Sequence, residues 1–258
     1  IIQVAIDDVE FRYLNILLES VFDKDNFISN IPIMHNPRGR SDDKFIATSH
    51  EYLICYSKCI EKLKTFNLIQ TRDEIKKKYP KNDAISRYRE LPLKRSGSNS
   101  RRIDRPNLFY PIYFNPINNE LSLEEKNDFI KILPLDSGGV ERVWRWGKDK
   151  VKESFKTEFI VKKINDNYSI AAKDREKSDI KPKSLWVNPR YDASSHGTML
   201  LKKLFTNNEF DYPKSLFAVM DSIQIGSNSG FILDFFAGSG TTGHAVLKLN
   251  KEDEGNRK

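Results

Sequence analysis

The feature that most constrains the fold of this chain is a glycine-rich segment at residues 230–246. The apolar run Phe231-Ile232-Leu233 ends at Asp234, and the glycines that follow lead into a stretch with the composition of a helix. A strand, a glycine turn and a helix in this order place free backbone N–H groups in a crevice at the carboxyl end of the strand. The segment therefore predicts an α/β domain that binds a nucleotide-type cofactor at this turn.

Two classes of cofactor fit the turn when it is considered alone. Residues 238–243 match the G-x-G-x-x-G pattern of dinucleotide enzymes, which is a weak match by itself. Such enzymes also carry an acidic residue about 20 positions further on, and only 15 residues follow Gly243. A nicotinamide enzyme stays open at this point, and what separates the two readings is the Asp-Phe-Phe-Ala-Gly sequence that opens the turn.

Residues 234–242, Asp-Phe-Phe-Ala-Gly-Ser-Gly-Thr-Thr, resemble the S-adenosylmethionine-binding motif I of DNA amino-methyltransferases. In that family the aspartate and the glycine turn hold the methionine part of the cofactor. The resemblance implies a cofactor site formed by Asp234, Phe236, Ala237, Gly238, Ser239, Gly240 and Thr241.

A segment upstream resembles motif X of the same family. It begins at His196-Gly197-Thr198 and runs through Leu204-Phe205 to Phe210-Asp211-Tyr212-Pro213-Lys214-Ser215-Leu216. Motif X packs beside motif I, with a turn fixed by the proline and a lysine that can meet a carboxylate. The resemblance adds Pro213, Lys214 and Ser215 to the implied cofactor site.

The order of the motifs, X before I, is that of the circularly permuted β class of DNA amino-methyltransferases. The segment Ile6-Asp7-Asp8-Val9-Glu10 resembles the motif V region of that class, and residues 36–58 resemble its DNA-facing loop and following strand. The implied fold is α/β: a Rossmann-like S-adenosylmethionine-dependent methyltransferase fold. Its two parts would be residues 1–62 and 184–258, separated by an inserted α+β target-recognition domain at 63–183.

The hydrophobic pattern at the front of the chain also predicts alternating strands and helices. Ile1 to Ile6 predicts a buried strand, and residues 51–56 predict another. Between them Asp7 and Asp8 can cap a helix on which apolar residues recur at helical spacing: Leu14, Leu17, Leu18, Val21 and Phe22. This alternation favours a parallel sheet.

The predicted insertion has a basic centre, residues 87–105, with seven Lys and Arg residues against Glu90 and Asp104. Such a stretch suits a phosphate backbone, and arginine can also hydrogen-bond to base edges; a merely solvated basic loop is the alternative. With the loop near residue 38, it predicts a DNA-binding surface of Arg38, Arg40, Lys94, Arg95, Arg101, Arg102 and Arg105.

Two tryptophan-containing stretches, Arg142 to Lys148 and Lys181 to Trp186, resemble the modification (Mod) subunits of type III restriction-modification systems, which methylate adenine. The resemblance implies double-stranded DNA, a restriction (Res) subunit and a second Mod copy as partners. The spacing of Trp144 and Trp146 puts both on one face of a strand. There they either pack the inserted domain or stack on DNA.

Composition excludes a membrane protein, because 31% of the 258 residues are charged and no apolar run approaches the roughly 20 residues that span a bilayer. The formal charge is +7, from 43 Lys and Arg against 36 Asp and Glu. Cys55 and Cys59 have no second pair to complete a zinc set and predict structural thiols. The chain is therefore expected in a reducing bacterial cytoplasm, without a metal.

The Asp-Pro-Pro-Tyr motif that polarises the target amino group in this family is missing from the sequence. The nearest string, Asn188-Pro189-Arg190-Tyr191, lies immediately before the motif X segment, so we expect a linker turn there. The permuted order puts the catalytic motif before residue 1 and the ribose-binding acid after Lys258. A catalytically incomplete module that binds only DNA and cofactor, and a cytosine amino-methyltransferase, remain alternatives.

The mechanism implied for the intact enzyme is direct transfer. Adenine is extruded from the duplex, because its amino nitrogen cannot be reached within the stack. Oriented by hydrogen bonds, that nitrogen attacks the methyl group of the cofactor in line.

Overall fold

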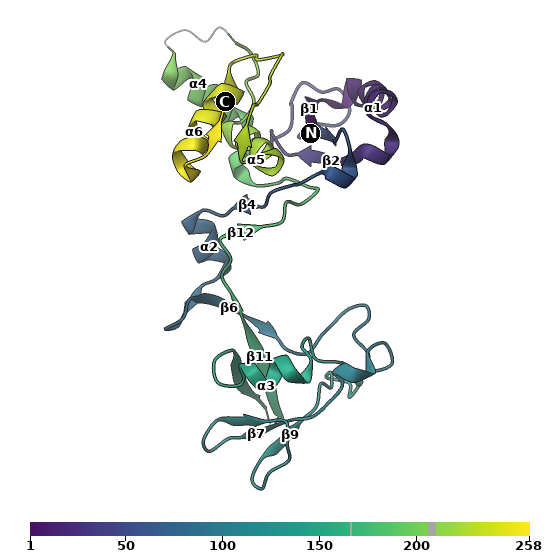
Figure 1. Cartoon of the computed structure of the whole chain (residues 1–258), viewed down its shortest axis with the longest axis vertical. Helices are drawn as coiled ribbons and strands as arrows, with labels where there is room; N and C mark the ends of the chain where they lie inside the picture. Colours follow the sequence, from purple (N-terminus) through teal and green to yellow (C-terminus); the bar gives the residue numbers. More distant parts are fainter. Residues whose placement is uncertain (166, 206–209) are drawn as a thin grey trace. The chain divides into compact units, whose positions relative to one another are not determined.

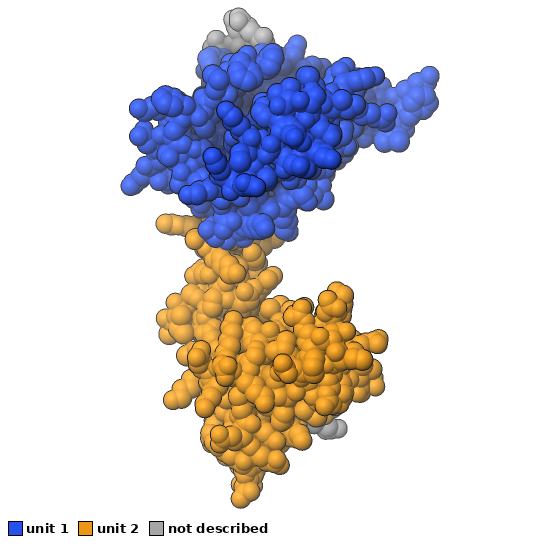
Figure 2. All heavy atoms as spheres, turned by 45° about the vertical axis from the view of Figure 1, so that its right-hand side comes forward, with its two compact units in different colours: residues 1–69, 179–258 blue, residues 70–178 orange. Residues whose placement is uncertain are grey.

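The computed structural model describes residues 1–165, 167–205 and 210–258, and these form two compact units. Unit 1 combines residues 1–69 with 179–258, and unit 2 comprises residues 70–178 (Figures 1 and 2). Each unit contains both helices and strands, so the predicted mixed α/β class is confirmed.

Unit 1 contains four helices and seven short strands among its described residues. They are β1 (Ile2–Ile6), α1 (Asp8–Phe22), β2 (Phe27–Ile33), β3 (Glu51–Tyr56), β4 (Leu68–Ile69), β12 (Asp179–Ile180), α4 (Met199–Leu204), α5 (Leu216–Gly226), β13 (Ser229–Gly230), α6 (Thr241–Asp253) and β14 (Asn256–Arg257).

The main sheet of unit 1 has the order β1-β3-β2, and β3 is antiparallel to both neighbours. The prediction of a purely parallel sheet is therefore wrong. The helix α1 connects β1 to β2 and leaves these two strands in the same direction, but the direct β2–β3 hairpin returns the chain between them. Because the reversed strand is the central one, both strand pairs of this sheet are antiparallel.

The central strand β3 packs a helix against each face. Ile54 and Tyr56 contact Leu18 of α1, whereas Leu53 and Cys55 belong to a cluster with Ala218 of α5. This alternation follows from the period of two along a strand. The outer strand β1 is only half-buried, so the strand prediction at Ile1 to Ile6 is confirmed and its burial is not.

Helix α1 begins as predicted, because Asp7 Oδ1 accepts hydrogen bonds from the backbone N–H groups of Val9 at 3.1 Å and Glu10 at 3.4 Å. Leu14, Leu18 and Phe22 lie against the sheet. Leu17 and Val21, predicted on the same apolar face, are exposed.

The apolar run Phe231-Ile232-Leu233 before the glycine turn does not form the strand that the sequence predicts. The strand β13 ends at Gly230 and pairs in parallel with β14, and Ile232 N donates to Lys258 O at 2.8 Å beyond it. Phe231 and Leu233 are exposed, whereas Ile232 between them packs against the cluster of α5 and α6.

Unit 2 is built from a four-stranded and a three-stranded antiparallel sheet, in the orders β10-β11-β6-β5 and β8-β7-β9. Its elements are α2 (Arg72–Lys78), β5 (Lys81–Asn82), β6 (Arg87–Pro92), β7 (Ile112–Asn115), β8 (Glu120–Ser122), β9 (Ile130–Ile132), α3 (Lys148–Ser154), β10 (Phe159–Ile164) and β11 (Asn167–Arg175). One core cluster joins both sheets and α3 through Leu93, Ile112, Val151 and Ile170, so this unit has a hydrophobic core of its own.

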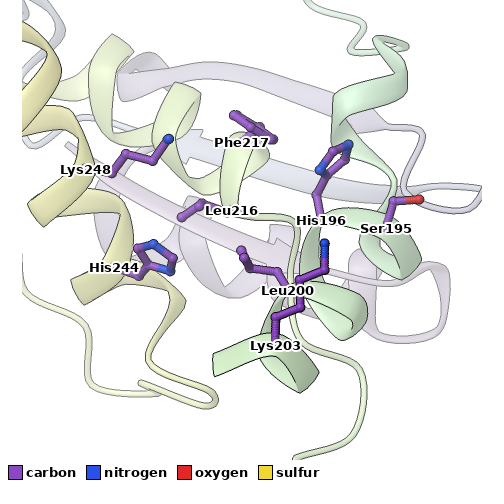
Figure 3. Close-up of a pocket in the computed structure, with 8 residues that line it drawn as sticks. All are labelled: Ser195, His196, Leu200, Lys203, Leu216, Phe217, His244 and Lys248. Atoms are coloured by element: carbon purple, nitrogen blue, oxygen red, sulfur yellow. The ribbon is translucent and has the colours of Figure 1, made fainter. Parts of the chain in front are cut away.

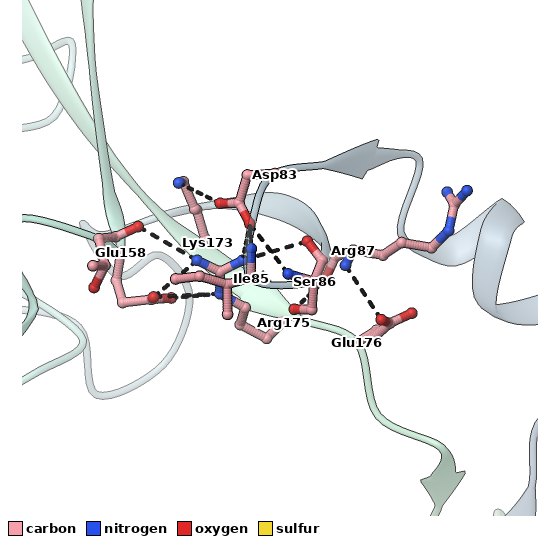
Figure 4. A network of polar contacts seen from close by, with 9 residues as sticks. Asp83, Ile85, Ser86, Arg87, Glu158, Lys173, Arg175 and Glu176 are labelled. Atoms are coloured by element: carbon pink, nitrogen blue, oxygen red, sulfur yellow. Dashed lines mark hydrogen bonds and ion pairs between the residues drawn. The ribbon is translucent and has the colours of Figure 1, made fainter.

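A polar network closes one end of the four-stranded sheet (Figure 4). Arg175, the last residue of β11, donates to Asp83 Oδ1 at 2.7 Å and to Glu158 Oε1 at 2.9 Å. Lys173 donates to the other oxygen of Asp83 at 2.7 Å. The network ties the turn before β6 to the segment before β10.

Within the described ranges no helix is both long and apolar enough to cross a membrane.

Candidate functional site

The predicted cofactor turn, Asp234 to Thr241, connects β13 to α6. Gly238 and Gly240 have φ values of 53° and 75°, in the left-handed region that favours glycine. Asp234 Oδ1 accepts a hydrogen bond from Phe236 N at 3.1 Å, and Gly240 N donates to Ala237 O at 2.8 Å. The aspartate and the glycines therefore fix a tight turn, as the sequence predicts.

The turn leaves the start of α6 open to a ligand. Gly240 is the N-cap of this helix, so no side chain caps its first N–H groups, and a Cβ at Gly240 would meet no atom within 4 Å. Ser239 and Thr241 place their hydroxyls 2.8 Å apart at the same point. Uncapped N–H groups at a helix N-terminus favour an anionic group such as a carboxylate. The turn thus fits a cofactor that carries one.

The second predicted cofactor segment lies against the turn through Phe210. A Cβ at Gly238 would come within 3.1 Å of Cζ of Phe210, so the ring is packed on this glycine. Within the second segment itself, Gly197 packs closely on the backbone of Pro213, since a Cβ there would lie 2.5 Å from Pro213 O. The structure therefore brings the two segments together, while residues 206–209 of the predicted motif X lie outside the described part.

Two of the three predicted motif X residues already have partners within the protein. The Lys214 ammonium forms an ion pair with the carboxylate of Glu51, the buried first residue of β3. The Ser215 hydroxyl is buried and donates to Arg190 O at 2.8 Å. Pro213 is buried as well. The ion pair connects the motif X segment to the sheet. That Pro213, Lys214 and Ser215 contact a cofactor stays a prediction.

A histidine lies near this ion pair. Burial lowers the pKa of His35, and the nearby Glu51 carboxylate partly opposes the effect. The Nδ1 atom of His35 is buried and has no hydrogen-bond partner among the described residues. This polar group lies at the base of the hairpin between β2 and β3.

A cavity of about 340 Å³ opens between α4, α5 and α6 (Figure 3). Its floor is apolar, with the Phe217 ring packed edge-on against His196 at 5.0 Å between centroids. Basic side chains surround it: His196, Lys203, His244 and Lys248. No residue of the turn from Asp234 to Thr241 lines this cavity, so we do not assign the predicted cofactor to it.

The string Asn188-Pro189-Arg190-Tyr191 forms a single 3₁₀ turn, in agreement with the linker interpretation. The Tyr191 ring is buried and stacks on Trp186 at 5.3 Å between centroids, and burial raises the pKa of its hydroxyl. A ring in this position has no free face on which a base could stack.

The basic centre of unit 2 is an ordered surface with exposed arginines. Arg102 pairs with Glu141 at 3.0 Å and lies over the Phe109 ring, and Lys94 donates to Leu135 O at 2.6 Å. Arg101 and Arg105 are exposed, whereas Arg95 is half-buried. In unit 1, Arg38 and Arg40 are exposed on the hairpin between β2 and β3.

Of the two roles expected for Trp144 and Trp146, packing within the inserted domain or stacking on DNA, the structure shows packing. Trp144 is buried in the core of unit 2, where its Nε1–H donates to Tyr110 O at 2.8 Å, and Trp146 packs against the same cluster. Cys55 is also buried, which raises the pKa of its thiol to about 12, as expected for a structural cysteine. The described residues contain no cluster of metal-binding side chains.

A family model described as DNA methylase matches residues 1–253. The chain belongs to this DNA methylase family.

Three relatives of this methylase are named as a type II methyltransferase or as Mod subunits of type III restriction-modification enzymes. The type II methyltransferase M.KpnI of Klebsiella pneumoniae is 37% identical over 263 residues, which cover 100% of this chain and 60% of the relative. The Mod subunit of the type III enzyme EcoPI of Escherichia phage P1 is 32% identical, over 100% of this chain and 41% of the relative. The StyLTI Mod subunit of Salmonella typhimurium is 24% identical, over 98% and 36%.

The similarity to type III Mod subunits is therefore confirmed, and it extends to a type II enzyme with higher identity. The chain spans about 60% of the length of the type II methyltransferase and less than half of either Mod subunit.

Sequence reasoning missed two features of unit 1 that lie on or beside the β2–β3 hairpin. Glu51 was recognised only as part of a strand, although a carboxylate that opens an apolar strand needs a partner when it is buried. Phe45 and Ile46 were not singled out, because two apolar residues within a polar loop carry no periodic signal. The structure exposes both of them.

Proposed function

We propose that this protein transfers a methyl group from S-adenosylmethionine to the exocyclic amino group of adenine in double-stranded DNA, as the modification enzyme of a bacterial restriction-modification system. The observation that carries the proposal is the open turn from Asp234 to Thr241, with its uncapped helix, in a chain of the DNA methylase family. A cytoplasmic location follows from such a substrate.

The proposed fold is Rossmann-like with an inserted target-recognition domain. The sheet β1-β3-β2 between α1 and α5 supports the first part, since helices cover both of its faces and its outer strands β1 and β2, joined through α1, run in the same direction. Unit 2 supports the second, because residues 70–178 form a separate core within the chain.

In this proposal, the cofactor-binding residues are those of the turn and of the adjacent segment. The turn supplies backbone N–H groups to a carboxylate, and Asp234 holds the turn in shape. Lys214 supplies a positive charge in the adjacent segment and remains paired with Glu51. When bound, S-adenosylmethionine supplies a reactive methyl group, so the protein has to orient the reactants and exclude competing nucleophiles.

The proposed DNA contacts come from both units. Arg101, Arg102 and Arg105 of unit 2 neutralise phosphates or hydrogen-bond to base edges, and Arg38 and Arg40 contact the backbone from the β2–β3 hairpin. The partners proposed from the Mod similarity are a Res subunit and a second copy of the chain. A type II enzyme, which M.KpnI exemplifies by name, is the alternative assignment.

The test is cofactor binding and methyl transfer by the full-length protein, with an Asp234→Ala variant. We expect wild-type protein to transfer labelled methyl groups to the amino group of adenine in unmethylated DNA. Loss of the hydrogen bond to Phe236 should open the turn, so calorimetry should show cofactor affinity reduced by at least roughly 10-fold, with DNA affinity largely unchanged.

The matched control is Glu252→Ala, which removes an exposed carboxylate from α6 outside the turn. Unchanged cofactor affinity in Asp234→Ala would overturn the assignment of the turn. Label in cytosine would support the cytosine enzyme, and binding of DNA and cofactor without transfer would leave only a binding module. Binding of NAD instead of S-adenosylmethionine would support the dinucleotide alternative.

A further inference from the structure

The hairpin that connects β2 to β3 ends in two adjacent, fully exposed apolar side chains. Phe45 is 87% exposed and Ile46 is 85% exposed. A single exposed apolar residue is ordinary, but a neighbouring pair at the tip of a loop leaves an apolar surface that water solvates poorly. The position of this pair is therefore informative about what the loop contacts.

The tip is held in place by its own hydrogen bonds. Beyond the paired strands, Asn36 N donates to Ser49 O at 3.0 Å and Arg40 N donates to Thr48 O at 3.1 Å. Asp43 Oδ2 accepts a hydrogen bond from Thr48 N at 2.7 Å, which closes the loop around Phe45 and Ile46. These bonds continue the hairpin past the sheet, so its apolar tip projects from an ordered support.

Positive charge surrounds the apolar pair. Arg38, Arg40 and Lys44 are exposed, and the Lys44 ammonium lies 5.1 Å from the centroid of the Phe45 ring. Of the two acidic residues nearby, Asp43 is engaged by Thr48, and Asp42 is exposed. An aromatic side chain between cations suits a polyanion whose bases can stack, because arginine and lysine bind phosphate while the ring stacks on a base.

The base of the same hairpin adjoins the candidate cofactor segment. Glu51, where β3 begins, pairs with Lys214, and His35 O accepts a hydrogen bond from Ala193 N at 2.9 Å. Both contacts lie within unit 1. The hairpin that carries the tip is therefore attached at its base to the segment that is proposed to hold the methyl donor.

We infer that Phe45, with Ile46 beside it, inserts into the base stack of DNA next to the target nucleotide and occupies the space that the extruded base leaves. The inference deepens the proposed function and rests on it. An extruded base costs the stacking and pairing energy of one nucleotide. An apolar wedge that stacks on the neighbouring bases offsets part of this cost and keeps the base from returning.

The experiment uses the full-length protein and two variants of the tip, Phe45→Ala and Phe45→Trp. The recognition sequence is first read from the positions that the wild-type protein methylates in plasmid DNA. Two duplexes containing that sequence are then compared. In one the target base is paired, and in the other it faces an abasic site, where extrusion requires no unpairing.

We expect Phe45→Ala to slow methyl transfer to the paired duplex by roughly 10- to 100-fold, the change that corresponds to a lost base–aromatic stack. On the duplex with the abasic site the loss should be less than about threefold, because that substrate needs no wedge. Phe45→Trp should retain activity on both, and Ile117→Ala, which removes another exposed apolar residue, should match wild type. With 2-aminopurine at the target position, Phe45→Ala should lose the fluorescence increase that wild type gives on binding.

An equal loss of methyl transfer on both duplexes, or an unchanged fluorescence increase, would overturn the inference that Phe45 acts as a wedge. A change in the oligomeric mass of Phe45→Ala, with the two substrates affected alike, would instead identify the tip as a contact between protein chains. If the wild-type protein methylates no DNA at all, the proposed function fails, and that result is distinct from a wild-type enzyme whose Phe45→Ala variant is fully active.

Discussion

Tyr191 donates a hydrogen bond from its hydroxyl to Asp221 Oδ2 at 2.5 Å, inside unit 1 where Arg190 contacts the same oxygen. We expect Tyr191→Phe to lower the free energy of unfolding by about 1–3 kcal/mol, because a buried carboxylate loses one of its donors. Urea denaturation measures this change. Tyr212→Phe is the control, since that ring is 84% exposed, and its effect should stay within about 0.5 kcal/mol. Equal effects of the two substitutions would contradict the structural role of Tyr191.

The same residues show how far single positions could be predicted. Asp7 as a helix cap and the glycines at 238 and 240 follow from local chemistry, because their partners lie within a few positions in the sequence. The partner of Lys214 could not be predicted in this way, since Glu51 is 163 positions away. Only the fold brings this pair together, and it changes the expected role of the lysine from a free cation to a paired one.

Among the elements, the end of β11 is held in place by a network of ionised side chains. Arg175 donates to Asp83 and Glu158 and holds the pKa of both carboxyls below their ordinary values of 3.8 and 4.5. A carboxyl with a lowered pKa in the folded state contributes its full stability above the ordinary pKa, and this contribution declines as the pH falls from the ordinary pKa to the lowered one. Unit 2 should therefore lose stability as the pH falls below about 4.

The test is Arg175→Met, compared with Arg89→Met, which breaks a more exposed pair with Asp174 in the same sheet. Near neutral pH, Arg175→Met should lower the midpoint of thermal unfolding more than the control does, because two carboxylates lose their main partner. At about pH 3 the gap between Arg175→Met and wild type should narrow, since both carboxyls are then largely protonated in the unfolded chain of either protein, and folded wild type, which keeps them ionised, loses part of its advantage. A gap of constant size would show that the network does not cause the acid sensitivity.

Elements were predictable where one stretch of sequence carried the whole signal. The strand at 2–6, the helix at 8–22 and the strand at 51–56 each have their own apolar period. The place of β3 between β1 and β2 was not predictable, because strand order depends on contacts between segments. The strand expected up to Leu233 does not form for the same reason, as a strand needs neighbours and β14 pairs only with Ser229 and Gly230.

For the whole molecule, the net positive charge comes from one unit. Residues 70–178 contain 25 Lys and Arg against 17 Asp and Glu, whereas the rest of the chain contains 18 against 19. The net charge of +7 therefore comes from a surplus of 8 in unit 2 and a deficit of 1 in unit 1. A surplus of this kind attracts a polyanion and accelerates its association. Unit 2 should thus provide most of the salt-dependent affinity for DNA.

This distribution gives a measurable expectation for the exposed arginines of unit 2. Removing two arginines that each contact a phosphate makes the slope of log affinity against log salt concentration shallower by up to roughly 2 units, at about 0.9 for each contact. We expect the double variant Arg101→Ala and Arg102→Ala to bind DNA more weakly and with a shallower slope. The double variant Lys152→Ala and Lys163→Ala removes the same charge from other exposed positions of unit 2 and should keep the wild-type slope. Equal slopes for the two double variants would mean that the affinity for DNA depends only on the total charge of unit 2. The turn at Arg101 would then be a solvated loop.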